Sequence, residues 1–181
     1  MSDEEIILLY KNGEEEAFKE LINRYTSPLY NFVARLGSKN DASDIVQETF
    51  IKVWKNMNRF DENKASFKTW IFTIAKNTAY DYFKKKKTVP FYNFTDEQGN
   101  NKLENIADEN IFPDELLMRA DAANILEKKL QELPEHYRLI LNLHYQEDFS
   151  LSEIAAILKI PYNTAKSQHQ RGLVKLRELL K

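Results

Sequence analysis

The side chains best suited to chemistry in this sequence lie in one stretch, residues 67–87, FKTWIFTIAKNTAYDYFKKKK. An amide, an aromatic ring and cations recur on one side of the helix that this stretch predicts, and the stretch ends in four lysines. Cations attract phosphates, while unstacked bases need flat aromatic surfaces and a group that hydrogen-bonds their edges. The pattern therefore fits capture of an opened nucleic-acid strand by Lys76, Asn77, Tyr80 and Lys84.

The same stretch has a plainer interpretation as an ordinary amphipathic helix. A lysine-rich C-terminal end complements the helix dipole without binding any ligand. The stretch alone does not decide between the two interpretations, so the rest of the chain has to. In both of them the buried side of the helix is expected to hold Phe67, Ile71, Ile74, Thr78 and Tyr82.

Composition favours helices and argues against an enzyme. The chain has 181 residues, of which 43% are hydrophobic and only four are glycine and five proline, so we predict an all-α protein. It has no cysteine, no glycine-rich phosphate loop and no His-Glu metal spacing, so we expect no catalytic residue, cofactor or metal. The three histidines are scattered, and His169 is expected to be a packed or rim residue without a partner histidine nearby. With an acidic N-terminus and no long apolar run, the sequence predicts a cytoplasmic protein without membrane insertion.

Charge is distributed in alternating blocks, although the formal net charge is only −2. Residues 51–90 carry 10 basic and 3 acidic groups, and residues 136–181 carry 7 and 4. Residues 1–50 and 91–135 are acidic, with net charges of −5 and −7. Because exposed charges are screened beyond roughly 10 Å, the local potential matters more to a polyanion than the total. A net charge near zero therefore permits nucleic-acid binding but predicts that the isolated protein binds weakly.

Start and stop signals divide residues 1–90 into helices. Ser2 or Asp3 is expected to cap the first helix, and Pro28 to begin a new helix that Gly37 ends. Asp41 is expected to cap the helix that follows, DASDIVQETFIKVWKNM. Residues 58–66 then form a polar loop in which Arg59, Phe60 and Lys64 are available to a ligand.

The helix after Asp41 has a polar face that also carries an isoleucine. Asp44, Gln47 and Glu48 share this face with Ile51. Most polar helical faces meet only solvent, but an exposed isoleucine among carboxylates favours a protein-binding face. The buried side is expected to hold Val46, Phe50, Val53, Trp54 and Met57.

The C-terminal part predicts a helix-turn-helix. Residues 91–113 lose all periodicity and read as an acidic linker, after which a helix from Asp114 ends at Leu133. A second helix covers residues 135–146, Ser152 caps a short third helix, and Asn163 or Thr164 caps the last one. On the last helix a polar side suited to the DNA major groove carries Lys166, Ser167, Gln170 and Arg171.

Three segments together resemble the extracytoplasmic-function group of RNA polymerase sigma factors: DASDIVQETFIKVWKNMNRF, FKTWIFTIAKNTAYDYFKKKK and LPEHYRLILNLHYQEDFSLSEIAAILKIPYNTAKS. The resemblance covers nearly the whole chain except the linker. It implies two small helical domains: a sigma region 2 bundle at residues 1–90 and a region 4 helix-turn-helix domain at residues 114–181. The acidic linker, residues 91–113, joins them.

The resemblance also assigns residues to partners. It implies docking on the clamp coiled coil of core polymerase, contact of Asn77 with a flipped-out base of the −10 element, and reading of the −35 element by the last helix. The core-binding residues are Asp44, Gln47, Glu48 and Ile51. The −10 residues are Arg59, Lys64, Lys76, Asn77, Tyr80 and Lys84, and the −35 residues are Thr164, Lys166, Ser167, Gln170 and Arg171.

Further partners follow from the family alone. They are the flap of core polymerase and an anti-sigma factor, with the free protein a monomer. Gln168 and Leu173 stand where relatives often carry arginines, so the −35 sequence cannot be copied from a relative. Two other interpretations stay open: a stand-alone helix-turn-helix regulator that binds a palindrome as a dimer, and a helical adaptor that does not bind DNA.

Overall fold

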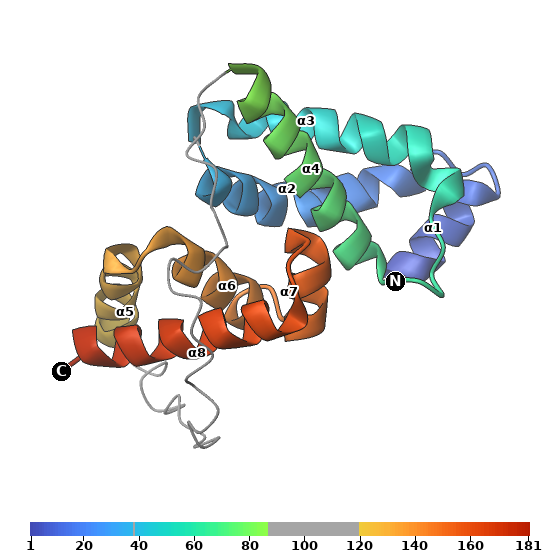
Figure 1. Ribbon diagram of the computed structural model, residues 1–181. Coiled ribbons are helices and arrows are strands. Elements are labelled where there is room, and N and C mark those ends of the chain that lie inside the picture. Colours follow the sequence, from blue (N-terminus) through green and yellow to red (C-terminus); the bar gives the residue numbers. More distant parts are fainter. Residues whose placement is uncertain (38, 87–119) are drawn as a thin grey trace. The chain divides into compact units, whose positions relative to one another are not determined.

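The computed structural model describes residues 1–37, 39–86 and 120–181, without the side chains of 120–124 and 127. All regular elements of the described residues are helical, so the predicted all-α class is confirmed (Figure 1). The helices divide between an N-terminal unit, α1 to α4, and a C-terminal unit, α5 to α8. Their bounds are α1 Asp3–Lys11, α2 Ala17–Leu36, α3 Lys39–Asn56, the 3₁₀ turn η1 Met57–Arg59, α4 Phe67–Lys86, α5 Ala120–Glu132, α6 Glu135–Tyr145, α7 Leu151–Leu158 and α8 Tyr162–Leu179.

In the N-terminal unit, α2, α3 and α4 pack against one another and α1 packs on α2. Aromatic rings join the helices: Phe32 of α2 lies 5.1 Å from Phe72 of α4, measured between ring centroids. Tyr25 and Phe67 make a similar edge-to-face contact at 5.5 Å. Such pairs add to the free energy gained by burying the rings. The centre of the unit is therefore an aromatic and aliphatic core shared by three helices.

Two start signals in this unit were assigned wrongly from the sequence. α2 runs through Pro28 without a break, because Tyr25 and Leu29 are buried on either side of it and continue one apolar stripe. That burial offsets the hydrogen bond that proline cannot donate. Asp41 lies inside the first turn of α3, which begins at Lys39, and its carboxylate binds side chains of α4 instead of capping its own helix. Ser2 does cap α1, and Glu5 completes a capping box with it.

In the C-terminal unit, α5, α6 and α8 pack together around Leu133, Leu141 and Leu176. α7, a left-handed Lys159 (φ 57°) and α8 form the predicted helix-turn-helix. The cap of α7 is Ser150 rather than Ser152, because Ser150 and Glu153 exchange side-chain to backbone hydrogen bonds. No side chain caps α8, which begins at Tyr162 after Pro161, so neither Asn163 nor Thr164 is its cap.

The predicted linker, residues 91–113, and the start expected at Asp114 lie outside the described residues. The boundaries 1–90, 91–113 and 114–181 therefore stay a prediction. Among the described helices, none is long and apolar enough to span a bilayer.

Close packing of α8 on α6 depends on Gly172. A Cβ atom there would lie 3.2 Å from the Cβ of Tyr137 and 3.3 Å from a methyl of Leu141. We predict that Gly172→Val destabilises the C-terminal unit by about 1–3 kcal/mol through overpacking. Urea unfolding followed by far-UV circular dichroism measures this. Tryptophan fluorescence should not change, since Trp54 and Trp70 both lie in the N-terminal unit.

Glu178→Val is the matched control because it places the same residue at an exposed position of α8. Its effect should stay within about 0.5 kcal/mol. Equal losses in the two variants would mean that valine acts through helix propensity and not through the contact with α6.

Candidate nucleic-acid interface

One side of α4 carries the side chains predicted to hold a nucleic-acid strand. Lys76 and Asn77 are half-buried, Tyr80 is 38% exposed and Lys84 is exposed. The ammonium of Lys76 lies 5.6 Å from the centre of the Tyr80 ring, a cation–π distance. At 100° per residue these four positions fall within one third of the helix circumference. The structure therefore brings the four predicted residues of α4 together on one strip.

The buried side of α4 differs in part from the predicted one. Ser66 caps the helix by accepting a hydrogen bond from the Thr69 amide. Ile74 and Tyr82 are only half-buried, and the burial is centred on smaller residues than expected. The fully buried side chains of α4 are Phe67, Thr69, Ile71, Phe72, Ala75, Thr78 and Ala79.

The loop before α4 presents two cations but not the expected aromatic ring. Arg59 and Lys64 are exposed, and Lys64 forms an ion pair of 3.1 Å with Asp61. Hydrogen bonds from Lys64 and then Asn63 lower the pKa of Asp61. Phe60 is only 7% exposed, since its ring packs edge-on against Phe67 at 5.5 Å. Phe60 is therefore a core residue and the prediction that it meets a ligand is wrong.

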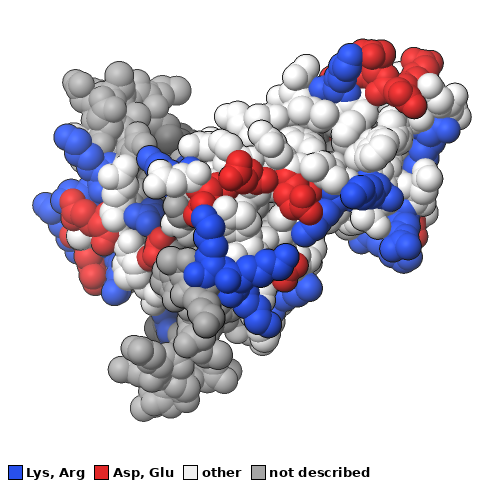
Figure 2. Space-filling model, turned by 90° about the horizontal axis from the view of Figure 1, so that it is seen from above, with Lys and Arg blue, Asp and Glu red and all other residues white. Residues whose placement is uncertain are grey.

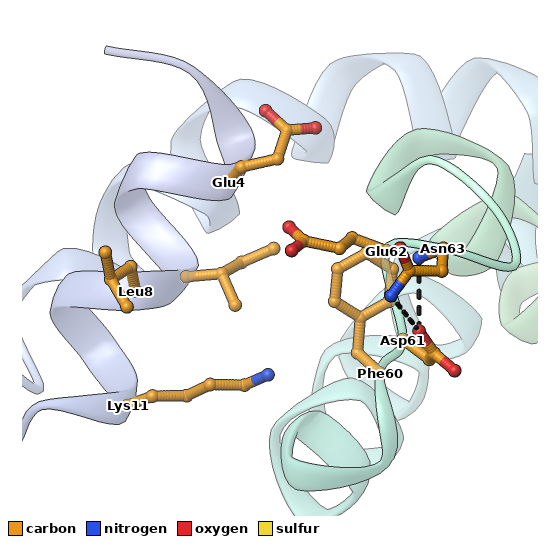
Figure 3. A pocket seen from close by; sticks show the side chains of 8 residues that line it. Glu4, Leu8, Lys11, Phe60, Asp61, Glu62 and Asn63 are labelled. Atoms are coloured by element: carbon orange, nitrogen blue, oxygen red, sulfur yellow. Dashed lines mark hydrogen bonds between the residues drawn. The ribbon is translucent and has the colours of Figure 1, made fainter.

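A cleft of about 270 Å³ between α1 and this loop was not predicted from the sequence. Figure 3 shows Lys11 of α1 extending toward Phe60 and the loop across the cleft. Three carboxylates against one ammonium make its rim acidic and poorly suited to phosphate. Its lining consists of Glu4, Ile7, Leu8, Lys11, Phe60, Asp61, Glu62 and Asn63.

The outer face of α3 carries the predicted polar residues and, in addition, an apolar residue that was not predicted there. Asp44, Gln47 and Glu48 are exposed, and Ile51 is 45% exposed beside them. Trp54, expected in the core, is 54% exposed. It follows Ile51 by three residues and so lies on the same side of the helix. The correction enlarges the candidate protein-binding face by one indole ring.

The outer face of α8 carries the residues predicted for the major groove. Lys166 is exposed, while Gln170 and Arg171 are half-buried. Ser167 donates a hydrogen bond of 3.1 Å to the carbonyl of Thr164. Gln168, which by the family resemblance stands where relatives often have arginine, is buried. The five residues predicted to face the groove, Thr164, Lys166, Ser167, Gln170 and Arg171, all lie outside the buried stripe of α8.

His169 has a partner histidine, contrary to prediction. Its ring centroid lies 4.9 Å from that of His144, and its Nε2 atom lies 3.2 Å from the Tyr145 hydroxyl. The Nδ1 atom of His144 lies 2.7 Å from the carbonyl of Phe149, which requires a proton on that nitrogen. Burial, and then the neighbouring His144, lowers the pKa of His169 to about 4. In the described residues no group of three or more His, Cys, Asp or Glu side chains could hold a metal.

Charge on the surface is divided into patches. Figure 2 shows lysine and arginine side chains gathered beside separate acidic clusters. A basic strip on one helical unit and a helix-turn-helix in the other are the features of a two-part DNA-binding protein.

Comparison with known proteins specifies the class further. Residues 21–89 match sigma-70 region 2, and residues 123–176 match sigma-70 region 4. The ECF RNA polymerase sigma factor SigW of Bacillus subtilis is 34% identical over 176 residues, which cover 94% of this chain and 92% of SigW. The ECF RNA polymerase sigma-E factor of Escherichia coli K12 is 29% identical over 170 residues, covering 93% and 88%.

Two solved structures share the fold. The sigma factor RpoE of Bartonella quintana, in complex with the anti-sigma factor NepR, aligns with a TM-score of 0.60 and 27% identity over 90% of this chain and 96% of RpoE. CnrH, in complex with the cytosolic domain of CnrY, aligns with a TM-score of 0.62 and 22% identity over 98% and 96%. The chain belongs to the extracytoplasmic-function group of sigma-70 RNA polymerase sigma factors. It is accordingly a subunit that binds core RNA polymerase and promoter DNA.

The histidine pair predicts a pH-dependent C-terminal unit. His169 has a pKa of about 4 in the folded protein against 6.5 ordinarily, so the unfolded chain binds more protons between these values. The stabilisation is complete above pH 6.5 and is lost as the pH falls toward 4. We therefore expect the urea concentration at the midpoint of unfolding, followed by circular dichroism, to decrease when the pH is lowered from 7 to 5.

His169→Phe keeps a ring against Tyr145 but cannot titrate, so its midpoint should depend less on pH over this range. The same pH dependence in the wild type and in His169→Phe would exclude His169 as the cause.

Proposed function

We propose that this sigma factor docks on the polymerase clamp coiled coil with the outer face of α3 and captures an unpaired −10 base with Asn77 of α4. The observation that supports this most is the packing of α3 on α4, with the Nζ atom of Lys52 3.2 Å from the hydroxyl of Thr78. Because the two helices are packed together, a polymerase bound to one orients the other. The cost of unstacking a base, a few kcal/mol, is then met by a site already held in place.

In this proposal the residues of the strand site have separate tasks. Asn77 hydrogen-bonds the base edge and Tyr80 offers a ring for stacking. Arg59, Lys64, Lys76 and Lys84 attract phosphates without choosing a base. Thr164, Lys166, Ser167, Gln170 and Arg171 contact duplex DNA at the −35 element, where an amide and a guanidinium can read base edges in the major groove.

The protein contributes binding rather than catalysis, and it acts in the cytoplasm with the polymerase. An anti-sigma factor is a further proposed partner, because the related RpoE of Bartonella quintana was solved with NepR. A stand-alone regulator would bind duplex DNA tightly without polymerase. Gel shifts with and without core polymerase distinguish the two, since the proposal requires core for strong binding.

Asn77→Ala and Asp44→Ala should each reduce promoter-specific transcription in a reconstituted reaction with core polymerase. Loss of a base-reading contact costs about 1–3 kcal/mol, roughly tenfold or more in open-complex formation for Asn77→Ala. Asp44→Ala should instead weaken binding to core. Asn31→Ala removes the same side chain as Asn77→Ala, and Glu15→Ala removes another carboxylate, both at other exposed positions, and both should be silent. Unchanged initiation in both site variants would refute the assignments.

Trp54→Ala should weaken the affinity for core polymerase by about 2 kcal/mol or more, as expected for an aromatic residue central to an interface. The fold should survive, because the side chain is 54% exposed. Fluorescence anisotropy of labelled protein titrated with core measures the affinity. Leu8→Ala removes another exposed apolar side chain, at 61% exposure on α1, and should leave the affinity unchanged. A similar loss in both variants would indicate a nonspecific effect of surface hydrophobicity.

A further inference from the structure

The last turn of α4 is attached to the first turn of α3 and to Gly37, which follows α2. The ammonium of Lys86 lies 2.6 Å from a carboxylate oxygen of Asp41, and the Tyr82 hydroxyl donates to the same oxygen at 3.1 Å. The Lys86 ammonium also lies 4.8 Å from the centre of the Tyr82 ring. Four residues before Asp41, the backbone of Gly37 meets the ring of Phe83 so closely that a Cβ atom would overlap it. Tyr82 and Lys86 are therefore held by Asp41 of α3, and Phe83 packs against Gly37.

Because of this attachment, Lys84 and Lys86 point to different sides of α4. Tyr82 and Lys86 are four residues apart and share one side of α4, the side of Asp41. Lys84 lies about 200° around the helix from each of them. It instead continues the strip of Asn77 and Tyr80, since it follows Tyr80 by four residues. The lysines at 84 and 86 are thus neighbours in sequence but point to different surroundings.

We propose that Lys86 is not a phosphate ligand but an anchor, and that Asp41 is a positioning residue which holds Lys86 and Tyr82 on the side of α4 opposite Lys84, away from the −10 strand. The side chain of Asp41 is only 20% exposed, so water competes weakly for its carboxylate. The hydrogen bond that Lys86 donates to Asp41 raises the pKa of Lys86, in keeping with a stable pair. The proposal rests on the proposed function, because it assigns a role in binding the same strand.

The salt dependence of binding distinguishes an anchoring lysine from a phosphate ligand. Each phosphate contact on a single strand contributes about 0.7 to the slope of log K against log salt concentration. The probe is a fluorescein-labelled non-template oligonucleotide spanning the −10 region of a promoter mapped for this sigma factor, bound to holoenzyme. Lys84→Gln should flatten the slope by about 0.7, whereas Lys86→Gln should leave it unchanged. Equal flattening by these two matched substitutions overturns the proposal.

Asp41→Asn tests the positioning role. The amide oxygen still accepts from the Tyr82 hydroxyl, but the charge that holds Lys86 is gone. A released Lys86 should add a phosphate contact and steepen the slope by about 0.7, and Asp41→Asn with Lys86→Gln should restore the wild-type slope. A purely structural Asp41 would alter stability without altering the slope, so an unchanged slope in Asp41→Asn, where Lys84→Gln does flatten it, contradicts the proposal.

A measurement without DNA keeps this proposal separate from the proposed function. Urea unfolding followed by the fluorescence of Trp54 and Trp70 reports on the N-terminal unit. Asp41→Ala and Lys86→Gln should each lower the midpoint, and the double variant should lose less than the sum of the two, because the pair is already broken. Additive losses overturn the anchor. If no variant changes DNA binding while the losses are non-additive, the proposed strand site fails and the anchor stands.

Discussion

Burial of aromatic rings between α2 and α4, represented by the contact of Phe32 with Phe72, is the interaction on which the N-terminal unit depends. Both rings are almost completely excluded from water, and α3 adds Ile45, Val46, Phe50 and Val53 to the same core. A helix that buries one stripe has to present the others to solvent. The positions of the residues on α3 that we propose to contact polymerase, and of those on α4 that we propose to contact the strand, are therefore consequences of core packing.

In the C-terminal unit a different packing contact orients the exposed side of a helix. α8 approaches α6 closely at Gly172, so that its opposite side, with Lys166 and Gln170, faces outward. The pair formed by His144 and His169 adds a polar junction between the same two helices. In both units a tight contact on one side of a helix orients the proposed DNA-binding surface on the other side.

Electrostatics in this protein is decided by local partners. The total charge of −2 says little about DNA binding, and even the block of ten basic residues at 51–90 is not one uniform surface. Lys86 pairs with Asp41, while Lys84 is exposed on the side of Tyr80. Counting lysines therefore overestimates the number of cations that can contact phosphates.

The amino-acid sequence by itself determined the all-α class, the capped start of the first helix, the helix-turn-helix and the exposure of Asp44, Gln47, Glu48 and Ile51. These features depend on local propensity and on the 3.6-residue period, which can be read from neighbouring residues. The assigned roles in binding polymerase and DNA are proposals that came with the family resemblance and not with the period.

Tertiary structure alone decided the features that depend on residues far apart in the chain. Pro28 continues a helix because its neighbours are buried by α3 and α4. Trp54 is exposed because Phe50, Val53 and Met57 already fill the core. Phe60 is buried because its ring packs against Phe67 and Trp70. Asp41 does not cap its helix but binds Tyr82 and Lys86, which are 41 and 45 positions away in the sequence. His169 contacts His144, which is 25 positions away. A helical period shows which side a residue takes on its own helix, but not which distant side chain occupies the space beside it.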